Sequence, residues 1–257
     1  MESDVSREER SAETARYWEI DALRGVAMIL MTAFHLTWDL VFFGMVNVNM
    51  FRSPWPQFSQ VIATMFLSLA GVSLVISDNR AGKSQGFCKY LLRGLKVFGF
   101  GMAITLVTYI SVRSQFVVFG ILHLIGFSIV AAYPFLPRRR WWISLVVGLA
   151  LIAVGLYVNR QVTLSPWLIW LGINQLGRSM ADWYPVLPWY GLVLVCIPIG
   201  HALYPGGRRR FALPDWSGIP VIRELSFLGR HALLFYLVHQ PVLIGILSGI
   251  GAILPAR

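Results

Sequence analysis

The chain has 257 residues, of which 56% are apolar and 13% charged, against about 25% charged in soluble globular domains. Its mean hydropathy of +0.64 and several apolar runs of about 20 residues exclude an ordinary soluble or disordered protein and indicate a polytopic helical membrane protein. The net charge is +10, but the distribution of the charges points to a membrane and not to nucleic acid as the partner. Cys88 and Cys196 stand in no metal-binding spacing, so we expect neither a disulfide framework nor a metal site.

The first residues, 1–16, are polar and mixed in charge, and we expect a mobile cytoplasmic tail there. Residues 17–257 should form a single transmembrane domain with an all-α fold, a polytopic membrane helix bundle, because an open sheet would leave backbone groups unpaired in lipid. An apolar stretch over Leu164–Leu176 is too short to cross and begins near Pro166, which predicts an interfacial helix. About seven spanning helices are predicted, over 21–43, 58–78, 94–112, 117–136, 141–158, 183–203 and 228–250.

The orientation follows from the lysines and arginines of alternate loops. Most of them lie on the side of the N-terminal tail, including the runs Arg138 to Arg140 and Arg208 to Arg210. We therefore expect the N-terminus inside and the C-terminus outside, in the inner (cytoplasmic) membrane of the cell.

A few ionisable side chains lie inside the predicted spans, where each is costly unless it is paired or faces a cavity. His35 and Asp39 are four residues apart, on one face of a helix, so Asp39 could orient His35 as a general base. Counted from the inner ends of their helices, His35, His123 and His239 lie about 21, 20 and 15 Å up. Three histidines from three helices are thus predicted to share one layer, with interhelical hydrogen bonds as an equal alternative for His123 and His239.

Basic residues gather at the inner helix ends, where Arg24, Arg93 and Lys96 could form an anion site. The positive-inside bias alone explains most of them. At the outer mouth of the sixth span, Asp182 and Trp189 belong to the stretch DWYPVLPW, and its aromatic side chains could equally be anchors at the membrane interface.

Five stretches together resemble the catalytic domain family of heparan-alpha-glucosaminide N-acetyltransferase, particularly its short prokaryotic members. They are EIDALRGVAMILMTAFH (19–35) with WDL (38–40), FLSLAGVSL (66–74), FGILHLIG (119–126), DWYPVLPWYG (182–191) and GRHALLFYLVHQPVL (229–243). The resemblance implies a multi-span acyltransferase that takes acetyl from cytoplasmic acetyl-CoA and delivers it to an acceptor, an amino sugar in the lysosomal members. We expect no counterpart here of the large lumenal domain of those enzymes, so heparan itself does not follow as the acceptor.

In such an enzyme, the His35–Asp39 pair and the asymmetric charge suggest roles for the candidate residues. His35 would take the place of the acyl-handling histidine as base or acetyl carrier, with Asp39 beside it. The phosphates of acetyl-CoA would lie on Arg24, Arg93 and Lys96. We expect Asp182 and Trp189 to line the mouth through which the acceptor enters, and His123 to orient this substrate. Arg230 and His239 should support the core of the site.

Two other classes stay open from the sequence. Paired histidines inside a membrane can also be axial ligands of a b-type haem in an electron-transfer protein. A small proton-coupled transporter or lipid-binding protein could use them as a proton relay. The lipid bilayer is the expected partner in each case, and whether the bundle works as a homodimer also stays open.

Overall fold

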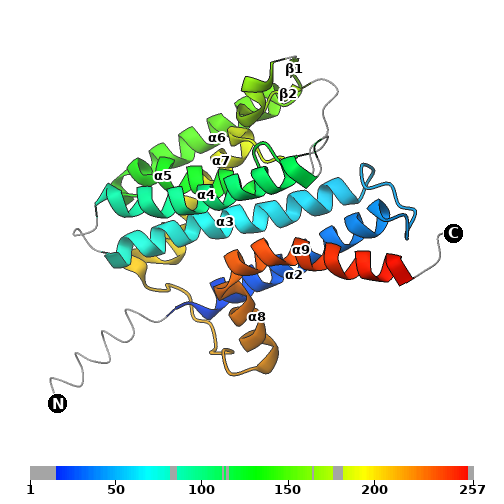
Figure 1. Ribbon diagram of the computed structural model, residues 1–257. Coiled ribbons are helices and arrows are strands. Elements are labelled where there is room, and N and C mark those ends of the chain that lie inside the picture. Colours follow the sequence, from blue (N-terminus) through cyan, green and yellow to red (C-terminus); the bar gives the residue numbers. More distant parts are fainter. Residues whose placement is uncertain are drawn as a thin grey trace. The chain divides into compact units, whose positions relative to one another are not determined.

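The computed structural model describes residues 16–81, 86–111, 113, 116–163, 165–175 and 182–253, and the predicted tail lies outside this part apart from Arg16. Six of the described helices are long and apolar enough to cross a membrane. They are α2 (Trp18–Phe42), α3 (Trp55–Ala81), α4 (Phe87–Ser111), α6 (Trp141–Val158), α7 (Val186–Leu203) and α9 (Ala232–Ile253) (Figure 1). The all-α membrane bundle expected from the apolar runs is thereby confirmed, while its orientation stays a prediction.

The shorter elements lie between these helices. They are α5 (Ile121–Ala131), α8 (Pro220–Arg230), the 3₁₀ helices η2 (Tyr133–Phe135), η3 (Arg138–Arg140), η4 (Pro166–Leu171) and η5 (Pro205–Gly207), and the strands β1 (Val162–Thr163) and β2 (Asn174–Gln175). The only α-helix in the predicted span 117–136, all of which the structure describes, is α5, whose 11 residues rise about 16 Å. Pro134 follows closely in η2 and cannot continue an α-helix. The run is therefore apolar throughout but helical for only about half the thickness of a bilayer.

Of the stretch Leu164–Leu176, where an interfacial helix was expected, the structure describes residues 165–175, which are helical only in part, and the place of this segment at the membrane interface stays a prediction. This stretch holds η4, a six-residue 3₁₀ helix, and β1 and β2 pair in parallel on either side of it. Gly172 ends η4 with φ of +123°, a backbone conformation that side chains other than glycine rarely adopt. The predicted last span, 228–250, is divided as well, because α8 ends at Arg230 and α9 begins at Ala232.

The chain forms two compact units, which are described separately; the single domain 17–257 stays a prediction. The first unit comprises residues up to Leu69 and Leu213 onwards, and so contains α2, the first part of α3, α8 and α9. Helices α2 and α8 pack backbone to backbone at Gly25 and Gly229, where an added Cβ would meet the main chain of Leu225 and of Asp21. Small residues permit such close approach between membrane helices.

The second unit runs from Ala70 to Ala212 and is built from two close helix pairs. Gly94 of α4 faces Gly126 of α5, and Gly148 of α6 faces Gly191 of α7, with each glycine Cα close to the opposite backbone. A buried hydroxyl adds to the second pair, because Ser144 Oγ donates to a main-chain oxygen of α7. Glycine contacts therefore set the helix packing in both units.

Candidate active site

Two of the three predicted histidines meet in the first unit. His35 lies on α2 and His239 on α9, and His239 Nε2 is 3.4 Å from His35 Nδ1. Their ring centroids are 5.0 Å apart, with an angle of 62° between the planes. The structure therefore brings together side chains that are 204 positions apart in the sequence.

The hydrogen bonds of this pair define the tautomers. His35 Nδ1 is 3.0 Å from the Met31 carbonyl oxygen, and His239 Nδ1 is 2.7 Å from that of Tyr236. A carbonyl only accepts, so each Nδ1 carries the proton of a neutral ring. His239 Nε2 then accepts from His35 Nδ1–H, and His35 Nε2 keeps a basic lone pair that no described residue engages.

One helical turn beyond this pair, Asp39 is held by a residue that the sequence analysis missed. Gln240 Nε2 donates to Asp39 Oδ1 at 2.8 Å, and only 4% of Asp39 is exposed. Among the described residues the Asp39 carboxylate forms no hydrogen bond with the His35 ring, and its role in orienting His35 stays a prediction. The signal for Gln240 was its position directly after His239.

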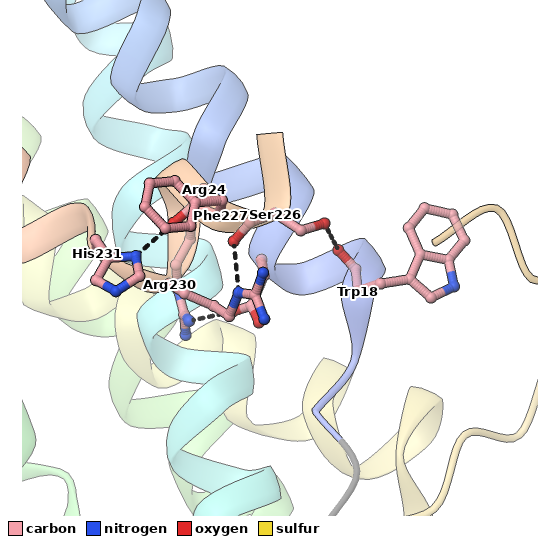
Figure 2. A network of polar contacts seen from close by, with 7 residues as sticks. Trp18, Arg24, Ser226, Phe227, Arg230 and His231 are labelled. Atoms are coloured by element: carbon pink, nitrogen blue, oxygen red, sulfur yellow. Dashed lines mark hydrogen bonds and ion pairs between the residues drawn. The ribbon is translucent and has the colours of Figure 1, made fainter. Parts of the chain in front are cut away.

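At the other end of α2, Arg24 and Arg230 belong to one polar network between α2 and α8 (Figure 2). Arg24 Nη1 is 3.1 Å from Asp21 Oδ1, and Asp21 also interacts electrostatically with Arg230. Arg230 Nε donates to the Ser226 carbonyl oxygen at 3.3 Å. Arg230 thus lies with Arg24, and the helix break at His231 separates it from α9; its role in supporting the core together with His239 stays a prediction.

His123 and Asp182 lie in the second unit and both cap the N-terminus of α5. His123, 1% exposed, accepts the Gly120 N–H on Nδ1 at 3.1 Å, so its Nε2 carries the proton and donates to Thr105 Oγ1 at 3.3 Å. Asp182 Oδ2 accepts the Ile121 N–H at 3.2 Å. These bonds satisfy donors that an α-helix leaves unpaired at its start, which gives both residues a structural task; their substrate roles stay predictions.

Three other predicted residues also belong to the second unit. Trp189 packs edge to face on Tyr184, with ring centroids 5.4 Å apart. Arg93 interacts electrostatically with Tyr90, and Lys96, one turn further along α4, is exposed. Their proposed contacts with acceptor and donor stay predictions.

The described residues contain no group of three or more side chains of the kinds that hold a metal ion. The histidine pair also fits a haem poorly. Axial ligation requires one nitrogen of each ring to face the iron from opposite sides, whereas His239 Nε2 points at His35 Nδ1, which itself donates to Met31. The geometry therefore does not favour the haem alternative.

The six apolar helices, with paired histidines and a buried carboxylate within them, define an integral membrane protein with a polar site in its spanning region. A family model described as heparan-alpha-glucosaminide N-acetyltransferase, catalytic, matches residues 16–241. The chain belongs to this family, which confirms the resemblance of the five stretches and supports a transmembrane acetyltransferase. No curated protein and no solved structure matched the chain.

Proposed function

We propose that this protein transfers an acetyl group from acetyl-CoA to an amine or hydroxyl of an acceptor, with His35 as the general base. The observation that carries the proposal is that His35 Nδ1 contacts both the Met31 carbonyl oxygen and His239 Nε2, from which its tautomer follows. Its Nδ1–H is engaged by Met31 and His239, which leaves Nε2 as the nitrogen that can take a proton.

The proposed reaction is balanced by one proton that passes through His35. Nε2 takes the proton from the acceptor nitrogen or oxygen as this atom attacks the carbonyl carbon of the thioester. The carbon–sulfur bond then breaks, and the imidazolium gives the proton to the CoA thiolate. The products are the acetylated acceptor and CoA thiol, and His35 is neutral again.

His239 supports this cycle in the proposal. Its Nε2 accepts the Nδ1–H of His35, which holds the ring in one tautomer and one orientation, the positioning task that a carboxylate has in a catalytic triad. An acetyl-His35 intermediate is the covalent variant of the same scheme. Trapping of labelled acetyl on His35 in the absence of an acceptor distinguishes this variant from direct transfer.

Acetyl-CoA enters this scheme from the side of the N-terminus, which we take as the cytoplasm. Arg24 and Arg230 would bind its phosphates, because guanidinium groups suit phosphate oxygens. Arg24 and His35 are eleven positions apart on α2, about 16 Å along the helix axis. The pantetheine arm would follow α2 over this distance and present the thioester to His35.

Of the two kinds of acceptor, the family favours the amine, and an amino sugar is the first candidate. The matched family is described as a glucosaminide N-acetyltransferase, and acetylation of a sugar amine is the reaction that this description implies. Glucosamine is therefore the first acceptor to test, with glucose as the matched sugar that has a hydroxyl instead.

The test uses the full-length protein in liposomes with labelled acetyl-CoA and glucosamine. The wild type should form labelled N-acetylglucosamine, and His35→Ala should lose this activity while the protein remains folded. Thr37→Val is the control and should retain activity, because among the described residues the Thr37 hydroxyl bonds only to the Ala33 carbonyl oxygen of its own helix. Unchanged turnover by His35→Ala would refute the mechanism, and substrate flux without acetyl-CoA would favour the transporter.

A further inference from the structure

Two oxygen atoms beside the histidine pair are buried without a hydrogen-bond donor. Asp39 Oδ2 and Gln240 Oε1 are both inaccessible, and neither has a partner among the described residues. Buried polar atoms in native proteins are nearly always hydrogen-bonded. Two neighbouring acceptors without donors therefore indicate that a group rich in donors binds here.

The charge of Asp39 narrows the chemistry of that group. Among the described residues, the one hydrogen bond to its carboxylate comes from the neutral amide of Gln240, and no lysine, arginine or histidine of this part forms an ion pair with it. A carboxylate within a spanning helix is costly unless a cation accompanies it. A primary ammonium supplies both a positive charge and up to three N–H donors.

We propose that Asp39 Oδ2 and Gln240 Oε1 bind the ammonium group of the acceptor and hold it next to His35. This inference rests on the proposed function and assigns the acceptor site to α2 and α9. Asp39 lies one turn from His35, about 6 Å along the axis of α2, and Gln240 directly follows His239. The bound ammonium releases one proton to the outer solution, and the resulting amine loses its second proton to His35 during attack.

Gln240 has two tasks in this site. Its Nε2 fixes Asp39 by donating to Oδ1, so Oδ2 is the oxygen left for the substrate. Its own Oε1 supplies the second acceptor. A site built to pair with a substrate donor discriminates strongly against an analogue that lacks it, because its polar groups are then left unpaired. A neutral hydroxyl in place of the ammonium would leave the charge of Asp39 uncompensated.

The experiment measures binding of glucosamine and of glucose to the full-length protein in nanodiscs by calorimetry, without acetyl-CoA. The wild type should bind glucosamine at least about tenfold more tightly than glucose. Asp39→Asn, which keeps the shape and removes the charge, should weaken glucosamine binding at least about tenfold and leave acetyl-CoA binding unchanged. Gln240→Met should weaken glucosamine binding in the same direction, and Thr37→Val should have no effect.

Equal binding of the two sugars by the wild type, or no saturable binding of glucosamine, would overturn the proposal. So would unchanged glucosamine binding in Asp39→Asn, because water would then satisfy the two oxygens. The comparison of the two sugars needs only the wild type, so it decides the matter even if both variants fail to fold. Selective glucosamine binding without acetyl transfer would refute the proposed function alone, whereas transfer without this selectivity would refute the acceptor site alone.

Discussion

Replacement of His239 tests whether this residue positions His35, the proposed general base, without itself taking part in proton transfer. The ring of His239 accepts one hydrogen bond from His35, and that bond is long at 3.4 Å and shares its donor with the Met31 carbonyl oxygen. The net contribution of such a bond is about 0.5–1.5 kcal/mol, which corresponds to a fall in kcat of about two- to tenfold. Loss of the general base itself should lower kcat about 10²- to 10⁴-fold.

The assay is acetyl transfer at saturating acetyl-CoA and acceptor, with His35→Ala, His239→Leu and His239→Gln compared in the same membranes. Gln retains an oxygen that can accept from His35, so His239→Gln should keep more activity than His239→Leu. The double variant of His35→Ala with His239→Leu should be no slower than His35→Ala, because the two residues act as a unit. The reasoning is refuted if His239→Leu and His239→Gln are both as inactive as His35→Ala.

Three further predictions concern packing, capping and the donor site. Gly229→Ala should lower the free energy of unfolding by about 1–3 kcal/mol, because its Cβ would meet the Asp21 main chain. Gly245→Ala is the control and should leave stability unchanged, because nothing lies within 4 Å of an added Cβ there. Thermal unfolding in detergent compares the two variants, and equal unfolding midpoints would contradict the packing of α2 against α8. Asp182→Ala should cost about 0.5–2 kcal/mol of stability as a lost helix cap, and unchanged stability with a raised acceptor KM would instead make Asp182 a substrate residue. Arg24→Gln should raise the KM for acetyl-CoA about tenfold with little change in kcat, because it removes a charged phosphate contact. Arg223→Gln, at an exposed arginine, is the control. An equal effect of both variants on KM would exclude a specific phosphate site at Arg24.

The long apolar runs were enough to predict most of the spanning helices, because a helix that crosses a bilayer needs about 20 apolar residues. For example, α6 (Trp141–Val158) coincides with its predicted span. The same criterion was insufficient for 117–136, where apolar composition continues past Pro134 although the helix does not. The criterion of apolar length also placed Arg230 and α9 in one predicted span, 228–250. Arg230 and His231 are the only strongly polar residues between Leu228 and His239 in the sequence, and they alone did not indicate a break.

The distances of His35 and His239 from the inner ends of their helices predicted that both lie at a similar depth in the membrane, and in the structure the two rings are in contact. Height alone does not say which face of a helix meets its neighbour. Helix α9 is apolar almost all round, so no polar stripe marks the side that carries His239 and Gln240. Gln240 was missed for a second reason: a search for ionisable groups passes over a neutral amide, although the amide N–H donates to the Asp39 carboxylate here.

Helix α2 connects the parts of the proposed reaction in one line. Arg24, His35 and Asp39 follow one another along it, and each is accompanied by a residue from the C-terminal part of the chain: Arg230 of α8, His239 of α9 and Gln240 of α9. The break between α8 and α9 is what permits this, because a continuous helix would carry Arg230 and His239 along a single axis and could not also place the α8 backbone against Gly25. Substitutions in α2 and in 220–240 should therefore act on the same three steps, namely donor binding, proton transfer and acceptor binding, in the same order along both segments.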